Sequence, residues 1–563
     1  MSQGAQSSQT SGLSSVDVAS LLDPACYPHP TSHLLLRETP ISWVLLTGTY
    51  AYKIKKPVQL DFIDAATLPR RRFLCEEELR LNRRFAPDLY HDVVAIGFEH
   101  GRLRIGATGA AAEYAVRMQQ FDGSQELASL LAARQVQTAE LAAFGAQLAQ
   151  WHQSAAAAQT VAAAQTASQD GSPAGRPAAG FEDYGTPAVV RAQVLDNFPP
   201  LRRRLQCDGR AGANDTAANE RARLRQLEQW TLETLTGLED LMTRRARCGR
   251  VRECHGDLHS GNVVRWGAQL LPFDCLEFDP RLRWIDAISD VAFLFMDLQS
   301  HARADLAYAF VSAYLEHGGD YEGMRLLRFY GVYRALVRAK VDALAVAGRS
   351  GGPPQLHRQH LDTRLRTATR LMSAQSAALV LMHGVAASGK SWLSERLISL
   401  LPAIRVRSDL ERKRLPPEPQ DGALQRHSPQ RYDAAATQAT YTRLLECAAS
   451  ALEGGHSVLI DATFLDGAQR LRFEALAEQH QRPWLIVSCH ASRPTLLQRL
   501  AQRAHQATDP SEATAAVLDQ QLQALQPLTQ SERTALVQID MDCTASIEPA
   551  LLGVQQRLRQ HQP

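Results

Sequence analysis

The chain has 563 residues, which is too long for one hydrophobic core, so we expect two or three domains. With 45% hydrophobic and 21% charged residues it has the composition of a globular protein, and a formal net charge of +2 gives no overall attraction to nucleic acid or to an acidic membrane. The nine cysteines form no Cys-x-x-Cys pair, which favours free thiols in a reducing compartment. No apolar run is long enough to span a bilayer, and we expect a cytoplasmic protein without membrane contact.

Segments rich in Ala, Gly, Ser and Pro mark the expected boundaries, because such segments bury too little apolar surface to become ordered. They predict a disordered tail at 1–15, a flexible insertion at 155–180 and a small polar loop at 207–218. A Gly- and Pro-rich stretch after a long helical region places the domain junction between about 348 and 376. The expected organisation is a first domain over 30–345, a linker over 346–375 and a second domain over 376–545.

The first domain begins with alternating apolar residues on both sides of Gly48, a pattern typical of a β-hairpin. The second strand of this hairpin, at 50–55, carries Lys53. In kinases a lysine on such a strand bridges the α and β phosphates of ATP and is held by a helix glutamate. Lys55 is an alternative, because alternate residues of a strand share a face.

A helix predicted over 73–85 carries three consecutive glutamates. Glu78 shares a helical face with the apolar Leu81 and Phe85, so it is best placed to point inward toward the lysine, with Glu77 as the alternative. A further alternating strand at 113–118 is a candidate for the segment whose backbone would meet adenine, although an ordinary sheet strand has the same pattern.

The stretch from His255 to Asp274 carries the strongest catalytic pattern of the first domain. His-Gly-Asp257 precedes Asn262 by the spacing of a kinase catalytic loop, in which the aspartate accepts the hydroxyl proton and the asparagine binds magnesium. A strand then delivers Asp274, whose carboxylate can reach the same Mg²⁺ ion from the other side. Asp290 is expected either to hold the catalytic loop through backbone hydrogen bonds or to cap the following helix.

On these residues, 30–345 resembles the aminoglycoside phosphotransferase-like kinases, which include the choline and homoserine kinases. The resemblance implies an α+β bilobal protein-kinase-like fold that phosphorylates a small-molecule hydroxyl with ATP. The chain departs from the kinase pattern because no Gly-x-Gly-x-x-Gly covers the phosphates and only Gly48 marks a turn. No acidic cluster for a polycationic acceptor can be located, so aminoglycosides are the less favoured substrates.

The second domain begins with an apolar strand at 377–382 that runs directly into a phosphate-binding loop and then a helix at 392–400. In such a loop glycines let backbone N–H groups surround the phosphates, the lysine neutralises the β and γ charge, and the final serine binds magnesium. The residues that match this pattern are Gly384, Ser388, Gly389, Lys390 and Ser391.

Further polar residues follow the predicted strands of the second domain. Asp409 and Arg412 lie one helical turn apart after a short strand, so both can face the phosphate site. Asp461 ends an apolar strand, as a magnesium-binding Walker B carboxylate does. Arg499 and Arg503, at i and i+4, predict a helical lid that closes two arginines on the transferred phosphate, although a solvated basic face has the same pattern.

From Gly384 to about 528 the chain resembles the P-loop kinases related to polynucleotide kinase, zeta toxin and gluconate kinase, in which Asp409 would be the general base and Arg412 its partner. This implies an α/β P-loop NTPase fold with a mainly parallel sheet that uses ATP and Mg²⁺. Asp461-Ala-Thr463 replaces the Asp-Thr-Asn usual in polynucleotide kinases. The order of the two parts resembles bacterial fusions of a phosphotransferase-like kinase with a P-loop ATP-binding protein.

These patterns predict a bifunctional ATP-dependent phosphotransferase acting on small-molecule hydroxyls. Nucleic acid is a possible but not favoured partner, since a 5'-hydroxyl kinase would need a groove of basic side chains. The residues available for such a groove are Arg405, Arg407, Arg412, Lys413 and Arg414. A third alternative makes one domain a regulatory ATP sensor that controls the other.

Overall fold

A computed structural model describes most of the chain. The described residues are 13–60, 63–158, 184–209, 215–345, 354–373, 377–415, 434–506, 514–543, 545 and 547–560. Two compact units are formed: the first has residues 1–136, 151–301 and 329–372, and the second has residues 137–150, 302–328 and 373–563. Within the described part of the chain, no helix is both long and apolar enough to cross a membrane.

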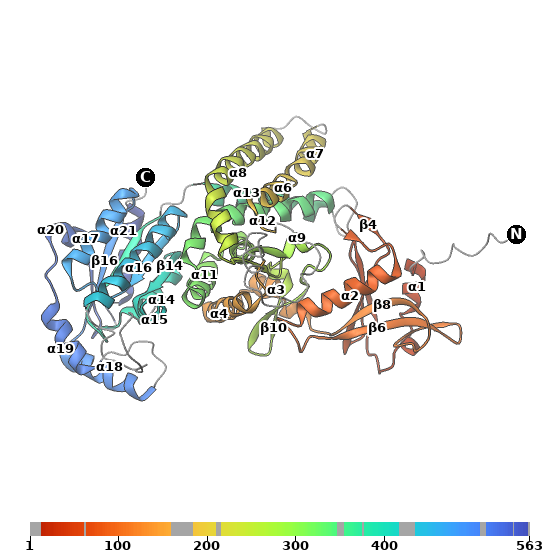
Figure 1. The fold of residues 1–563 in the computed structure, drawn as a ribbon, viewed down its shortest axis with the longest axis horizontal. Coiled ribbons are helices and arrows are strands. Elements are labelled where there is room, and N and C mark those ends of the chain that lie inside the picture. The colour runs from red at the N-terminus through yellow and green to blue at the C-terminus, as the bar shows by residue number, and fades with distance from the viewer. Residues whose placement is uncertain are drawn as a thin grey trace, which may run out of the picture. The chain divides into compact units, whose positions relative to one another are not determined.

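The first unit begins with an antiparallel six-stranded sheet in the order β1-β2-β3-β8-β6-β7. Its strands are β1 (Leu35–Glu38), β2 (Ser42–Leu46), β3 (Tyr50–Lys55), β6 (Tyr90–Glu99), β7 (Arg102–Ile105) and β8 (Ala111–Gln119). Helix α2 (Leu68–Asn82) is capped by the Thr67 hydroxyl and packs along β8, as Figure 1 shows. The hairpin around Gly48, the lysine strand and the glutamate helix are therefore confirmed.

The remainder of the first unit is mostly helical around two small β-ladders. Strand β9 (Val251–Glu253) pairs with β12 (Trp284–Asp286), and β10 (Val263–Trp266) pairs with β11 (Gln269–Pro272). The catalytic-loop sequence lies between β9 and β10, and its end forms the short helix η3 (Ser260–Asn262). Helix α10 (Ala287–Ser300) is buried along almost its whole length, because apolar residues occupy every side of it.

The longer helices of the first unit include α8 (Asp215–Arg247), α12 (Met324–Leu344) and α13 (Pro354–Met372). Helix α13 contacts α8 and α10, and it occupies most of the stretch 346–375 that the sequence analysis assigned to a linker. That assignment is corrected: amphipathic packing of α13 overrides the Gly- and Pro-rich signal that precedes it. At the end of the tail predicted over 1–15, Leu13 is buried and α1 (Ser15–Ser20) follows it. The rest of that tail and most of the predicted insertion lie outside the described residues, which omit 1–12 and 159–183.

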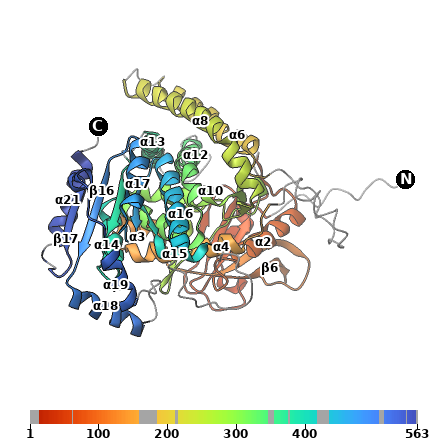
Figure 2. The same cartoon turned by 60° about the vertical axis from the view of Figure 1, so that its left-hand side comes forward.

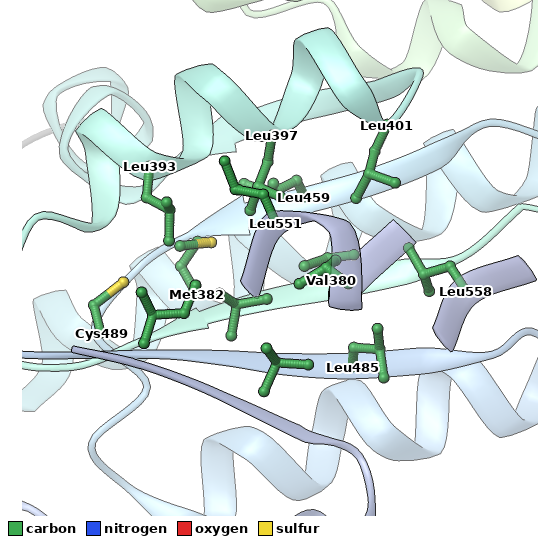
Figure 3. Close-up of a cluster of buried hydrophobic side chains, with 14 of the residues drawn as sticks. Val380, Met382, Leu393, Leu397, Leu401, Leu459, Leu485, Cys489, Leu551 and Leu558 are labelled. Atoms are coloured by element: carbon green, nitrogen blue, oxygen red, sulfur yellow. The ribbon is translucent and has the colours of Figure 1, made fainter. Parts of the chain in front are cut away.

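The second unit is built on a parallel five-stranded sheet in the order β14-β15-β13-β16-β17. The strands are β13 (Leu379–His383), β14 (Ala403–Arg407), β15 (Ser457–Asp461), β16 (Trp484–His490) and β17 (Leu536–Asp540). Helices α14 (Lys390–Leu400) and α21 (Ile547–Gln560) cover one face, and Figure 2 shows α21 beside β17. Figure 3 shows their leucines directed at β13, including Leu393, Leu397 and Leu551 around Val380.

An unexpected element of the second unit is α11 (Ala304–Gly318), which precedes the expected junction by some thirty residues and yet packs against β14 and α14. The Ser312 hydroxyl donates to the carbonyl of Ala403 and accepts from the amide of Arg405. Residues 137–150 join the same unit, because Gly145 lets a helix approach the Phe310 carbonyl so closely that a Cβ there would lie 2.2 Å from it. The compact units therefore do not follow the single chain boundary that composition suggested.

Candidate functional site

The first candidate centre is organised around Lys53 of β3. Its Nζ lies 2.9 Å from Oε1 of Glu78 on α2 and also forms an ion pair with Asp274. Burial alone would lower the pKa of Lys53, but the carboxylates of Asp274 and Glu78 raise it well above its usual range. The structure thus brings the loop aspartate to the lysine and the helix glutamate, although Asp274 follows Lys53 by 221 residues in the chain.

Lys55 lies two residues further along β3 and has different partners. Its Nζ is 2.5 Å from Oε2 of Glu78 and 2.5 Å from Oε1 of Glu277, and its side chain is fully buried. Glu78 therefore contacts both lysines, whereas the ion pair with Asp274 belongs to Lys53. Glu277 was missed by the sequence analysis, although its position three residues after Asp274 could have marked it.

Glu77, the alternative to Glu78, faces another group of charges. Its Oε1 lies 2.7 Å from Nη2 of Arg80 and 2.8 Å from Nη2 of Arg283. Both arginines also bind Glu253 of β9. Within the described residues Glu77 therefore belongs to a network that links α2 to β9 and α9 (Pro280–Arg283) rather than to the lysines of β3.

Asp257 lies in the catalytic-loop sequence and is linked to Asn262. The Nδ2 atom of Asn262 donates to the Asp257 carbonyl and carboxylate, each at 3.0 Å. Nε2 of His259 is 3.5 Å from the same carboxylate and 3.0 Å from Nη1 of Arg338. Burial would raise the pKa of Asp257, but the charges of His259 and Arg338 outweigh burial and hold it below its usual range, so the carboxylate is ionised at neutral pH.

Asp290 holds the loop through backbone hydrogen bonds, as one of the two interpretations of the sequence predicted. Its carboxylate accepts the backbone N–H groups of His255 (3.0 Å) and Gly256 (2.9 Å). The alternative, a helix cap, is wrong, because Asp286 caps α10 through its bond to the Ile288 amide. Gly256 has φ +87°, and a Cβ there would lie 2.8 Å from the Leu282 carbonyl, so only glycine fits.

A second support of the loop was not foreseen. The carboxylate of Asp297, one turn before the end of α10, accepts the backbone N–H of Ser260 at 2.9 Å and its hydroxyl proton at 2.5 Å. Nη1 of Arg364 on α13 lies 2.6 Å from the other oxygen. Nothing local in the sequence distinguishes Asp297 from any polar residue of an apolar helix, so no pattern could have found it.

The oxygen atoms in this centre suit a magnesium ion. Because the Nδ2 atom of Asn262 donates to Asp257, its amide oxygen is the atom that would face a cation. The Asp274 side chain is 44% exposed, so its carboxylate can exchange Lys53 for a metal. Two oxygen ligands together with phosphate oxygens match the hard-ligand preference of Mg²⁺.

Gly48 is the glycine whose turn the sequence analysis placed near the phosphates. In the structure the backbone N–H groups of Thr47 and Gly48 both donate to Oε1 of Gln120, each at 2.9 Å. Gln120 directly follows β8, so the turn is tied to the end of that strand. The two amide groups are consequently engaged by a side chain in this conformation.

The second candidate centre is the loop between β13 and α14. Gly384 has φ +134°, and a Cβ there would lie 2.6 Å from the Cys489 carbonyl; Gly389 has φ +97° and would meet the Met541 side chain. Both glycines are therefore required by the backbone path. The strand, loop and helix order expected of a phosphate-binding loop is confirmed.

Two polar side chains of this loop, those of Lys390 and Ser388, are buried. Nζ of Lys390 donates to the Val385 carbonyl at 2.8 Å, and the buried Oγ of Ser388 has no hydrogen-bond partner among the described residues. The amide of Ala386 donates to Oε1 of Gln521, on α19 (Ala515–Ala524), at 2.6 Å. A buried hydroxyl and a lysine inside a curled loop fit the β-phosphate of a nucleotide, because both groups donate hydrogen bonds to phosphate oxygens.

A cleft of about 340 Å³ opens beside the loop. It is lined by Lys390, Ser391, Asp409, Arg412 and Asp461, and by residues of α16 (Ala434–Glu453) and α19. Oδ1 of Asp409 lies 2.5 Å from Nη2 of Arg412, so the two form an ion pair at the wall of the cleft. Oδ2 of Asp461 accepts a hydrogen bond from the Ser394 hydroxyl at 3.2 Å, which orients the carboxylate at the end of β15.

The two arginines expected in a lid are placed differently. Arg499, on α18 (Arg493–Gln506), donates to the carbonyls of Ala387 (3.3 Å) and Met541 (2.8 Å) and so supports the loop from outside the cleft lining. The side chain of Arg503 lies outside the described residues. Helix α19 is among the helices that do line the cleft. No pattern identified its Gln521, which is 135 residues from the Ala386 amide that it contacts.

The basic groove expected for nucleic acid is largely neutralised by carboxylates. Nε of Arg405 lies 2.5 Å from Glu316, Arg414 pairs with the buried Glu411, and Arg412 pairs with Asp409. Nε of Arg407 is 3.9 Å from Asp461. These ion pairs reduce the positive potential that a phosphate backbone would require.

The chain is similar to a known family model over part of its length and to two other proteins over most of it. Residues 379–528 match the family model AAA_33, described as an AAA domain. Over 507 residues the chain is 29% identical to the uncharacterized protein Rv2004c of Mycobacterium tuberculosis and to the uncharacterized protein Mb2027c of Mycobacterium bovis, covering 88% of this chain and 92% of each relative.

Two solved structures are similar to different parts of the chain. A choline/ethanolamine kinase family protein from Mesorhizobium loti is 14% identical, with a TM-score of 0.36 and coverage of 64% of this chain and 95% of that one. A putative kinase from Chloroflexus aurantiacus is 20% identical, with a TM-score of 0.28 and coverage of 34% and 100%.

The chain thus joins an α+β unit, in which Lys53 meets Glu78 and Asp274, to an α/β unit, in which a phosphate-binding loop follows a strand of a parallel sheet. Lysines, carboxylates and a phosphate-binding loop are groups that phosphoryl transfer uses.

Proposed function

We propose that the protein is a bifunctional ATP-dependent phosphotransferase, in which each domain transfers the γ-phosphoryl group of ATP to a hydroxyl of a small molecule. The observation that carries this proposal is the convergence of Lys53, Glu78 and Asp274 beside the linked pair Asp257 and Asn262. Phosphoryl transfer depends mainly on positioning and charge stabilisation, and these residue types supply both.

In the first domain, Lys53 would bind the α and β phosphates once a nucleotide displaces its contact with Asp274. Asp257 would accept the proton of the acceptor hydroxyl as its oxygen attacks the γ-phosphorus and the bond to the β-phosphate oxygen breaks. Because the pKa of Asp257 is lowered, the carboxylate is ready to accept a hydrogen bond at neutral pH.

In the second domain, Lys390 and the loop N–H groups would bind the β and γ phosphates, and Asp409 would accept the hydroxyl proton. The ion pair with Arg412 holds Asp409 at the cleft wall. Each domain would also hold Mg²⁺, which when bound neutralises phosphate charge. The residues that would hold it are Asn262 and Asp274 in the first domain, and Ser391 and Asp461 in the second.

The proposal favours small acceptors over nucleic acid. Arg405, Arg412 and Arg414 have carboxylate partners, and the cleft of about 340 Å³ beside Lys390 is of a size that suits a metabolite. Label transfer from γ-labelled ATP to a 5'-hydroxyl oligonucleotide, decreasing with salt, would instead support an end kinase.

The test uses the full-length protein and a panel of hydroxylated metabolites, with ADP release and phosphorylated product measured together. Asp257→Asn and Lys390→Ala are made singly and combined. Phosphorylation of each acceptor should be impaired in only one of the two single variants. There kcat should fall by about 10²–10⁴-fold, because loss of a general base or a phosphate-binding cation has effects of that order.

Asp305→Asn and Lys340→Ala are matched controls, since these residues form partly exposed ion pairs with Arg303 and Asp196 away from the two sets. Both controls should retain activity. If neither Asp257→Asn nor Lys390→Ala lowers turnover with any acceptor, the proposal is wrong. ATP binding without turnover at one centre would make that domain a regulatory sensor.

A further inference from the structure

Three potential metal ligands meet in the first unit where the end of α12 lies beside the start of α13. Nδ1 of His357 is 3.4 Å from Oδ1 of Asp342, and Nδ1 of His360 is 3.8 Å from the same oxygen. One ligand atom from each residue falls within 4.8 Å of the other two. His357 and His360 are three residues apart on a helix and therefore share a face.

The carboxylate of Asp342 is poorly compensated for its degree of burial. Its side chain is 10% exposed, and in the described part of the chain its ion-pair partners are these two imidazoles, which carry a charge only when protonated. The contact with Nδ1 of His357 at 3.4 Å is a long hydrogen bond, and the 3.8 Å separation from Nδ1 of His360 lies beyond hydrogen-bond range. A buried carboxylate with only long contacts is unfavourable unless a cation lies near it.

The separations match a cation placed between the three residues. Zinc binds histidine nitrogen and carboxylate oxygen at about 2.0–2.2 Å in a tetrahedron, so neighbouring ligand atoms lie about 3.3–3.6 Å apart. The observed 3.4 and 3.8 Å fall at or close to that separation before any adjustment of the side chains. Imidazole ligands suit Zn²⁺ and other late first-row metals and disfavour Mg²⁺ and Ca²⁺.

We propose that Asp342, His357 and His360 form a Zn²⁺ site, with the fourth position filled by water. The half-exposed His360 provides the entry path. Another group, His152 with Cys254 and Asp290, does not qualify, because the Asp290 carboxylate already accepts the His255 and Gly256 amides.

The site would fasten the first turns of α13 to α12. Further along α13, Arg364 binds Asp297, which in turn holds the Ser260 amide next to the catalytic-loop sequence. A bound ion therefore stabilises the helix that supports this loop without touching the loop itself. Its role is structural, and it is independent of the phosphotransferase proposal.

The test uses untagged full-length protein stripped with a chelator and dialysed against Zn²⁺ in excess Mg²⁺, so that the phosphate centres hold magnesium. The exposed Cys248 and Cys543 are replaced by Ser to remove stray zinc ligands. About one Zn²⁺ per chain should be retained, Co²⁺ should give the visible absorption of a tetrahedral complex, and the unfolding temperature should rise with metal.

His357→Ala and His360→Ala should each abolish retention, while His33→Ala, at an exposed histidine elsewhere in the unit, should retain it. Because His360 is half exposed, its replacement leaves the fold intact, which circular dichroism checks. Retention of Zn²⁺ by both site variants, an unchanged Co²⁺ spectrum in them, or no retention by the starting protein would each overturn the proposal.

Discussion

Glu316 of α11 binds Arg405 of β14 through two hydrogen bonds, Nε to Oε1 at 2.5 Å and Nη2 to Oε2 at 3.1 Å. Each side chain is only 12% exposed. Burial would lower the pKa of Arg405, but the Glu316 carboxylate raises it, so the guanidinium stays charged. A helix that the sequence assigned to the first domain therefore stabilises the edge strand that precedes Asp409.

Glu316→Ala should destabilise the second unit by roughly 3 kcal/mol, because removing one partner leaves a buried arginine without its charge compensation. Urea unfolding, followed by hydrogen exchange in peptides of β14 and β15, measures this. Arg405→Met should recover part of the loss in the double variant, since no buried charge then remains.

The matched control for that cycle is the pair Arg325 and Glu453 in the same unit, whose side chains are 34% and 39% exposed. Glu453→Ala should cost less than about 1 kcal/mol, as exposed ion pairs do. Equal effects of Glu316→Ala and Glu453→Ala would show that α11 does not depend on its buried pair.

Lys53 and Lys55 should differ in what they contribute. In a Lys390→Ala background, Lys53→Met should lower kcat/KM of the first domain by about 10²-fold or more, because it removes a phosphate-binding charge. Lys55→Met should chiefly reduce stability, since it leaves Glu277 and Glu78 as buried carboxylates with one cation.

Steady-state kinetics and thermal unfolding of the same two variants separate these effects. Lys56→Met is the control, because Lys56 binds Glu38 at the surface of the same sheet. If Lys55→Met keeps normal stability but loses activity, Lys55 rather than Lys53 is the phosphate-binding lysine.

Gln521 should compete with nucleotide for the phosphate-binding loop. Its Oε1 accepts the Ala386 amide at 2.6 Å, so a phosphate oxygen must displace it. Gln521→Ala should increase the affinity for ADP by about two- to tenfold, the worth of one hydrogen bond. Calorimetry measures the affinity for ADP. The control is Gln520→Ala, at the neighbouring residue of the cleft lining. A weaker affinity would mean that Gln521 binds the nucleotide instead.

His456 should make the second unit sensitive to acid. Burial first, and then the charge of Arg328, lower its pKa to about 3, against an ordinary value of about 6.5. The unfolded chain therefore binds the proton more readily, so the stabilisation is complete above about pH 6.5 and declines as pH falls toward about 3.

Between pH 7 and pH 5 the free energy of unfolding should fall by at most roughly 2 kcal/mol because of His456. The His456→Gln variant should lack that part of the pH dependence. Urea titrations at the two pH values measure the difference. His383, whose pKa burial lowers to about 4, should leave a smaller residual dependence. An unchanged difference between the two pH values in His456→Gln would contradict the assignment.

Local patterns were sufficient to find most of both candidate centres. The hairpin with Lys53, the helix with Glu78, the loop with Asp257 and the strand before Gly384 each occupy a few consecutive residues whose spacing dictates a backbone path. Gly256 is an example, since its left-handed conformation is a local requirement that glycine alone meets cheaply.

Contacts between elements distant in the chain had no such signal. The sequence alone determined two phosphate-binding patterns, their order and the acidic partners nearest to them. Only the tertiary structure decided that Lys55 pairs with Glu277, that Gln521 rather than Arg499 lines the cleft, and that α11 joins the second unit. Such pairings depend on which helix faces pack together and which buried charges must be compensated, and both are settled by the whole fold.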